Sequence, residues 1–99
     1  MEKNLEFIAL YEIYGGMLTV RMKDIFEQYY YSDLSLREIA ANNNISYQAV
    51  NDSIKKSEKQ LLEYEKNIKA LEMKQDILHL IENSNNLKEI DKIARKYRW

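Results

Sequence analysis

Apolar residues recur along the chain at intervals of three and four, which is the spacing of one face of an α-helix. The first run spans residues 5–14 and is followed by Gly15 and Gly16, where a left-handed helix end costs little. A second run follows Thr19, which suits an N-cap. Its inward face is formed by Met22, Ile25, Phe26, Tyr29 and Tyr30. The pattern therefore predicts two helices before residue 32.

A short third helix is predicted to begin at Ser35, because Ser35 and Glu38 have the spacing of a capping box. Its inward residues are Leu36, Ile39 and Ala40. Three asparagines at 42–44 follow, and asparagine is the non-glycine residue that best tolerates a positive φ. Ser46 is placed to cap the next helix. These signals predict two helices joined by a tight polar corner.

The fourth helix carries an apolar seam whose steps alternate between four and three residues from Val50 onward, as in a heptad repeat. The seam predicts one unbroken helix from Tyr47 to about Glu82, roughly 50 Å long at 1.5 Å per residue. Such a helix needs a cover for its far half. A second copy of the chain is one cover, and the predicted dimer interface consists of Leu61, Tyr64, Ile68, Leu71 and Leu78.

A final helix is the other possible cover. Asn86 and Glu89 repeat the capping-box spacing, and this helix can fold back antiparallel across the loop 83–86. Its apolar face is formed by Leu87, Ile90, Ile93, Ala94 and Tyr97. The seam lacks a convincing ladder of parallel ion pairs, so antiparallel packing is favoured, either within the chain or between two chains.

The composition supports an all-α protein. The 99 residues include no proline and only two glycines, and the length suits one compact domain. We expect a single helical domain over 1–99, with a helix-turn-helix at 35–60 and a long-helix extension with a C-terminal helix at 61–99. The fold class is thus a helical bundle with one long helix.

Several function classes are disfavoured by composition. No cysteine is present, and one histidine cannot build a typical zinc site, so we expect neither metal nor cofactor. No catalytic signature gathers the carboxylates, so we expect no enzyme. No export signal or membrane span is evident, and we expect a cytoplasmic protein.

The corner at 42–44 has the features of a DNA-binding helix-turn-helix. Such a motif needs a small residue in its first helix, a turn residue at positive φ and apolar anchors under its second helix. Ala40 and Asn44 meet the first two needs, and the anchors are Ile45, Val50 and Ile54. The candidate nucleic-acid contacts are Arg37, Ser46, Tyr47, Gln48, Asn51, Lys55 and Lys56.

Each candidate has a chemical role on duplex DNA. Gln48 and Asn51 can pair with adenine, whereas Arg37, Lys55 and Lys56 can hold phosphates. Asp52 on the same face would repel phosphates, and the net charge of −1 does not favour DNA. The segment 35–60 itself has four basic and three acidic residues. The alternative is that this face is only a solvated surface.

The segment SLREIAANNNISYQAVNDSIKKSEKQL at 35–61 resembles the helix-turn-helix of sigma-factor region 4. Together with its flanking segments, residues 7–68 resemble the YlxM family of small bacterial proteins. The motifs that carry this resemblance are Tyr14-Gly15 ahead of Leu18-Thr19, Gln28-Tyr29-Tyr30, Asp33-Leu34-Ser35-Leu36, Glu38-Ile39-Ala40, Ser46, Gln48-Ala49-Val50 and Ile54-Lys55. Tyr47 and Lys56 depart from the family, which often has arginine there, and both departures remove a guanidinium.

The resemblance implies an all-helical regulatory protein with a region-4-like motif. It also implies a link to the signal recognition particle pathway, inferred for the family from neighbouring genes. Two hypotheses follow: the protein binds double-stranded DNA, or it is an adaptor that binds a signal recognition particle protein and no DNA. A homodimer is expected in either case.

Two other groups of residues are candidates for partner binding. Most of the tyrosines fall on predicted inward faces and belong to the core, whereas Tyr31 and Tyr47 are candidates for a partner surface. The basic segment 92–98 could touch RNA, lipid headgroups or an acidic protein, although cations also suit a solvated helix C-terminus. Trp99 is either anchored in a groove or frayed.

Overall fold

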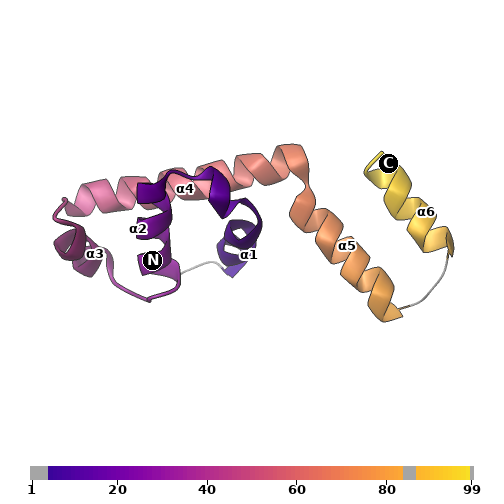
Figure 1. Ribbon diagram of the computed structural model, residues 1–99, viewed down its shortest axis with the longest axis horizontal. Coiled ribbons are helices and arrows are strands. Elements are labelled where there is room, and N and C mark those ends of the chain that lie inside the picture. Colours follow the sequence, from indigo (N-terminus) through magenta and orange to yellow (C-terminus); the bar gives the residue numbers. More distant parts are fainter. Residues whose placement is uncertain (1–4, 84–86, 99) are drawn as a thin grey trace.

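The computed structural model describes residues 5–83 and 87–98 (Figure 1). The elements are α1 (Leu5–Tyr14), the 3₁₀ turn η1 (Gly15–Met17), α2 (Val20–Tyr30), α3 (Leu36–Asn43), α4 (Tyr47–Ile68), α5 (Ala70–Asn83) and α6 (Leu87–Lys96). No strand occurs in these two stretches. The prediction of an all-α fold is confirmed.

The body of the protein consists of α1, α2 and α3 packed along one side of α4 (Figure 1). Apolar side chains from all four helices meet in one core, as the predicted inward faces require. The fully buried aliphatic and phenylalanine side chains are Leu10, Ile25, Phe26, Ile39, Val50, Ile54 and Leu61. This core fixes the ends of α3 and α4 that meet at the polar corner.

The core tyrosines combine ring packing with hydrogen bonds to carboxylates. Tyr14, Tyr29 and Tyr30 are buried, while Tyr31 and Tyr47 are about half exposed, as predicted. Tyr14 donates to Glu65 Oε1 at 2.6 Å, and Tyr30 donates to Glu58. Burial, reinforced by these carboxylates, raises the pKa of both phenols. Both hydroxyls therefore stay protonated and act as donors to α4.

The predicted left-handed end of α1 is wrong. Neither Gly15 nor Gly16 has a positive φ, and residues 15–17 continue as a 3₁₀ turn. Gly15 is needed for a different reason: a Cβ there would lie 2.9 Å from two ring carbons of Tyr11. That ring stacks on Phe26 with centroids 4.3 Å apart. The glycine therefore permits close approach of a side chain.

The single long helix predicted from Tyr47 to Glu82 is also wrong, because it breaks at Lys69. Lys69 has a left-handed backbone with φ 59°, and its N–H donates to the Glu65 carbonyl at 2.8 Å. The apolar seam continues through the break, which is why its spacing did not reveal two helices. Two residues of α1 and α4, Tyr14 and Glu65, stabilise the start of α5 after the break.

Glu65 and Tyr14 together cap the N-terminus of α5. The Glu65 carboxylate accepts from the backbone N–H groups of Leu71 and Glu72, each at 3.0 Å. The N–H of Ala70 donates to the Tyr14 hydroxyl at 2.9 Å. Such groups at a helix start need partners outside the helix. This joint fixes the direction in which α5 leaves the body.

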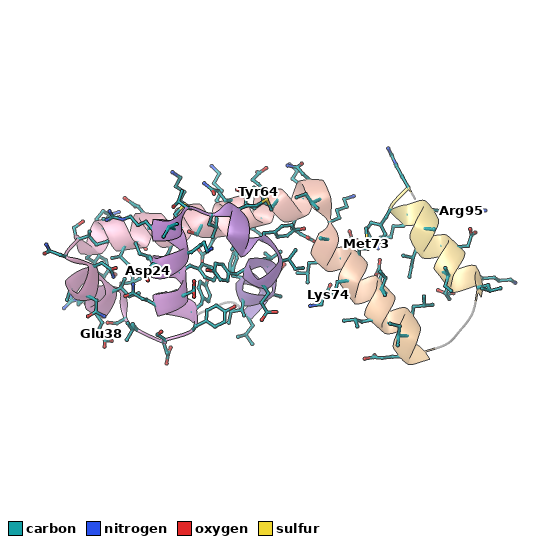
Figure 2. All side chains as sticks on the ribbon, viewed as in Figure 1. Asp24, Glu38, Tyr64, Met73, Lys74 and Arg95 are labelled. Carbon is teal, nitrogen blue, oxygen red and sulfur yellow. The ribbon has the colours of Figure 1, made fainter. Side chains whose placement is uncertain are left out.

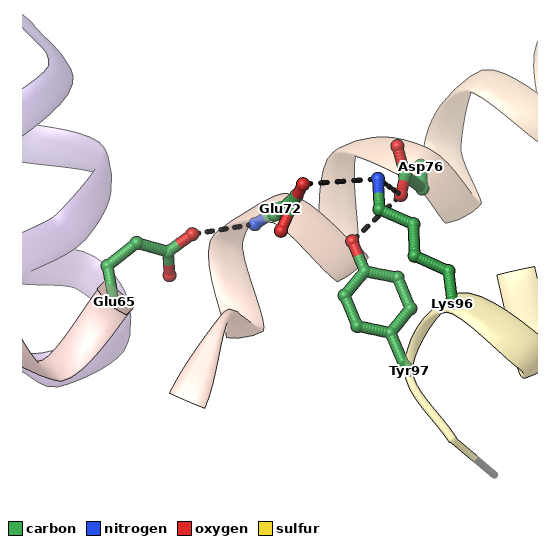
Figure 3. Close-up of polar contacts among 5 residues, drawn as sticks. All are labelled: Glu65, Glu72, Asp76, Lys96 and Tyr97. Atoms are coloured by element: carbon green, nitrogen blue, oxygen red, sulfur yellow. Dashed lines mark hydrogen bonds and ion pairs between the residues drawn. The ribbon is translucent and has the colours of Figure 1, made fainter. Parts of the chain in front are cut away.

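Helix α6 folds back along α5, as one of the two sequence alternatives predicts (Figure 1). Figure 3 shows the polar contacts at the open end of this hairpin. Lys96 Nζ lies 2.8 Å from Asp76 Oδ2 and 3.1 Å from Glu72 Oε1, and Tyr97 donates to Asp76 at 2.8 Å. The predicted cap at Asn86 and the alternatives for Trp99 lie outside the described residues.

The hairpin α5–α6 makes the molecule long and narrow. Its extents are 54 × 23 × 20 Å, and its radius of gyration is 17.1 Å. A compact chain of this length has a radius of gyration of about 13 Å. We call α5 and α6 together the arm.

The structure leaves only part of the predicted dimer seam accessible. Leu61 and Leu71 are buried within one chain, and Tyr64 packs on Tyr14 with ring centroids 5.9 Å apart. Ile68 and Leu78 are 50% and 48% exposed. Contacts inside the chain already cover Leu61 and Leu71, so neither offers a face to a second copy.

Candidate nucleic-acid interface

The corner between α3 and α4 has the backbone of a tight helix-turn-helix. Asn44 has φ 54° and ψ 46°, so it adopts the left-handed conformation that its residue type predicts. Its N–H donates to Ala41, and the N–H of Ile45 donates to the Ala40 carbonyl at 3.1 Å. This pair of bonds is a Schellman motif, which ends α3 and turns the chain into α4.

Side-chain caps fix both helix starts at this corner. Ser35 and Glu38 form the full capping box, with bonds of 3.1 and 3.0 Å. Hydrogen bonds from the Ser35 backbone and hydroxyl lower the pKa of Glu38, so its carboxylate stays charged at neutral pH. Ser46 Oγ accepts from the Ala49 N–H at 3.0 Å. The three predicted caps that lie within the described residues, Thr19, Ser35 and Ser46, are confirmed.

An amide pair that the sequence analysis missed ties the end of α3 to α2. Asn43 donates to Gln28 Oε1 at 3.0 Å, and Gln28 donates back to Asn43 Oδ1 at 3.2 Å. Asn43 also donates to the Ile39 carbonyl at 2.7 Å. No spacing rule links residues 28 and 43, so only the fold reveals the pair. It orients α3 and thereby the corner.

The first turns of α4 carry an exposed polar face. Tyr47 is 50% exposed, and Gln48 is also exposed, while Asn51 is half-buried beside the anchor Val50. Gln48 Nε2 donates to Asp52 Oδ1 at 2.8 Å, which holds the amide in one orientation. The Gln48 carbonyl and one of its N–H groups remain open, which is enough for a bidentate contact with adenine. Asp52 is an acceptor suited to the N4 amine of cytosine.

The predicted phosphate contacts surround this face. Arg37 lies in the first turn of α3, and Lys55 and Lys56 lie on α4; all three are exposed. None of them forms an ion pair with another described residue. Lys59 lies one turn beyond Lys55 on the same side of α4 and is exposed too, so it extends the predicted set. These cations are free to meet phosphates.

A shallow groove separates the start of α3 from the start of α4. It is lined by Tyr29, Asp33, Leu34, Ser35, Leu36, Arg37, Glu38 and Tyr47. Figure 2 shows Glu38 at the end of the molecule farthest from the arm. The groove is therefore lined by the carboxylates of Asp33 and Glu38 and, from α4, by Tyr47. An approaching phosphate backbone meets mixed charge, with Arg37 as the groove's one cation.

Other functional sites find little support in the described ranges. No group of three or more His, Cys, Asp or Glu side chains is placed to hold a metal ion there. None of the described helices is both long enough and apolar enough to cross a membrane. The corner with its exposed face is the most organised candidate site among these residues.

Comparison with known proteins gives a family match over almost the whole chain. Residues 1–97 match UPF0122, described as "Putative helix-turn-helix protein, YlxM / p13 like". A UPF0122 protein of Malacoplasma penetrans is 37% identical over 93 residues, which cover 91% of this chain and 87% of the relative. The corresponding match in Fusobacterium nucleatum is 40% over 77 residues, covering 78% and 75%. In Mycoplasma capricolum it is 43% over 91 residues, covering 92% and 80%.

Proposed function

We propose that this chain, which belongs to the UPF0122 family of YlxM-like helix-turn-helix proteins, is a non-enzymatic regulator that binds double-stranded DNA. Membership agrees with the resemblance found in residues 7–68 and extends it to residues 1–97. The family description names the motif and no reaction. The DNA-binding role rests on the residues at the corner.

The observation that carries the proposal is the exposed face of α4 beside a rigid corner. In a helix-turn-helix the second helix enters the major groove with its N-terminal residues on the base edges, and the first crosses the backbone. In this role Gln48 and Asn51 read bases, with Ser46 and Tyr47 at the edge of the groove. Arg37 contacts phosphate from α3, while Lys55 and Lys56 contact it from α4.

Charge sets the expected strength of binding. The candidate contacts provide three cations, Lys59 adds a fourth, and Asp52 opposes them. Four cations less one carboxylate leave a net of three positive charges. Each neutralised phosphate contributes about −0.9 to the slope of log K against log salt, so the total slope is about −3. We therefore expect moderate, salt-sensitive affinity for random duplex, with specificity supplied by base contacts.

The test is an anisotropy titration of labelled random duplex at several salt concentrations. Lys55→Ala with Lys56→Ala removes two phosphate contacts and is expected to flatten the salt slope by nearly 2. Arg21→Ala with Lys66→Ala is the matched control, since it removes two exposed cations outside the corner. Equal effects of both pairs, or no binding by the folded wild type, would contradict DNA binding at this face.

A second candidate function is that of a protein adaptor for a signal recognition particle protein. Two observations favour it: carboxylates of Asp52 and Glu38 stand among the cations of the corner, and Tyr31 and Tyr47 are half exposed. Exposed tyrosines suit protein interfaces, because they bury much area at low entropic cost. The link to the signal recognition particle pathway, which the family resemblance implies, motivates the choice of partner.

The adaptor hypothesis is tested by titrating the purified signal recognition particle protein in the same buffers. It predicts a complex whose affinity depends little on salt, and it predicts no binding to DNA. Tyr47→Ser should weaken the complex by about tenfold or more. The absence of a complex on gel filtration would count against the adaptor. DNA binding that weakens steeply with salt would favour the first proposal.

A further inference from the structure

The arm leaves much apolar surface uncovered. Among the described side chains of α5 and α6, only Leu71 is buried. Four large aliphatic side chains of the arm are between 44% and 79% exposed: Leu78, Ile81, Leu87 and Ile90. Where α4 meets α5, an apolar groove adds Ile68, Ala70, Met73 and Ile77, with Lys74 at its edge. Exposed aliphatic residues concentrated in this way mark an interaction surface.

The fold of a single chain cannot cover this surface with α6. Asp76 faces α6, because it contacts both Lys96 and Tyr97. An α-helix turns by about 100° per residue. Leu78 therefore lies about 200° around the helix from Asp76, and Ile81 lies about 140° from Asp76. Both side chains therefore point away from α6. Figure 2 also shows Arg95 on the side of α6 that faces away from α5.

The surface area of the chain indicates how much surface a partner could cover. A compact monomer of 11.9 kDa exposes about 6,000 Å², whereas this chain exposes 7042 Å². The excess is about 1,000 Å², and a standard protein interface covers about 800 Å² on each partner. The uncovered area thus matches one stable interface per chain.

The charges of the arm match those of a second arm. Helix α5 has three acidic residues and one basic residue, whereas residues 87–98 have five basic and two acidic residues. In a two-fold symmetric pair the same patch of both chains forms the interface. Placing α5 of one chain against α6 of its partner brings a net-acidic helix against a net-basic helix twice, although within each chain Lys96 already pairs with Glu72 and Asp76. A partner of a single charge sign would be attracted to one helix and repelled by the other.

We infer that the arm is a dimerisation surface whose occupant is the arm of a second copy of this chain. The two hairpins form a four-helix unit that buries Leu78 and Ile81 of α5 together with Leu87 of α6. This interface differs from the one the sequence seam predicts, since Leu61 and Leu71 stay in the core of each chain. The dimer carries two α3–α4 corners, one at the far end of each chain.

The test is the mass of the full-length chain by sedimentation, measured without DNA over micromolar to hundred-micromolar concentrations. We expect a wild-type dimer. Leu78→Glu with Ile81→Glu should weaken the dimer by at least about 100-fold, because each contact occurs twice in a two-fold symmetric pair. Leu62→Glu is the matched control, because Leu62 is 47% exposed but lies on α4, outside the arm. The mass of this variant should remain that of a dimer.

Circular dichroism of each variant verifies that the chain is still helical. Because no DNA is present, failure of the proposed DNA binding leaves this result unaffected. A monomeric wild type at every concentration would overturn the inference and leave the arm to a different protein. A dimer that persists in the folded arm variant would overturn it as well.

Discussion

Gly15 shows how one missing carbon atom shapes the contact between α1 and α2. The Tyr11 ring that would meet a Cβ at this position is held on two sides, by the stack on Phe26 and by a 2.7 Å hydrogen bond from its hydroxyl to Glu27 Oε2. The ring cannot turn aside without losing both contacts. At this residue the constraint is on side-chain packing, whereas the sequence pattern indicated a backbone constraint.

Gly15→Ala is therefore expected to lower the free energy of unfolding by about 1–3 kcal/mol, as overpacking of a fixed site does. Gly16→Ala provides the control, because no atom lies within 4 Å of its added Cβ and its φ is not positive. That change should stay within about 0.5 kcal/mol. Urea denaturation of both variants measures the difference. Equal destabilisation would show that the glycines matter for the backbone of the turn.

At the scale of whole helices, the starts of α2, α3 and α4 were predicted, whereas the break between α4 and α5 was missed. Thr19, Ser35 and Ser46 cap their own helices through bonds to residues three positions away, so local sequence is sufficient. Just after the break at Lys69, the N–H of Ala70 donates to the hydroxyl of Tyr14, which is 56 residues earlier in the chain. Sequence spacing does not encode such a contact. A lysine at positive φ also gives no warning, since asparagine and glycine are the usual signals.

Tyr14→Phe tests whether this joint stabilises the start of α5. The change keeps the buried ring but removes the hydroxyl that donates to Glu65 and accepts from Ala70. Loss of these two bonds should cost about 1–3 kcal/mol in the free energy of unfolding. Amide exchange at Ala70 should also quicken.

Tyr31→Phe is the matched control for that experiment. The Tyr31 side chain is 49% exposed, so removal of its hydroxyl should change stability by less than about 0.5 kcal/mol. If the two variants unfold at the same urea concentration and Ala70 exchanges at the wild-type rate, the joint contributes nothing and another contact must set the break.

At the scale of the molecule, the sequence predicted the helical class, the corner and the cations around it. These features rest on caps, on helical periodicity and on a single turn residue, all of which are local. The bond between Gln48 and Asp52 has ordinary i,i+4 spacing and could have been anticipated. The amide pair of Gln28 and Asn43 and the separate arm could not, because both depend on how distant helices pack.

The most direct test of the DNA-binding account is selection of binding sites by the wild-type protein from a pool of random duplexes. Base reading by α4 predicts a short shared motif, bound at least about 1,000-fold more tightly than random duplex. Asn51→Ala should relax the preference at one base pair by about 1–3 kcal/mol while leaving the rest of the motif unchanged. Recovery of sequences with no shared motif, by protein shown to be folded, would contradict the reading role of α4.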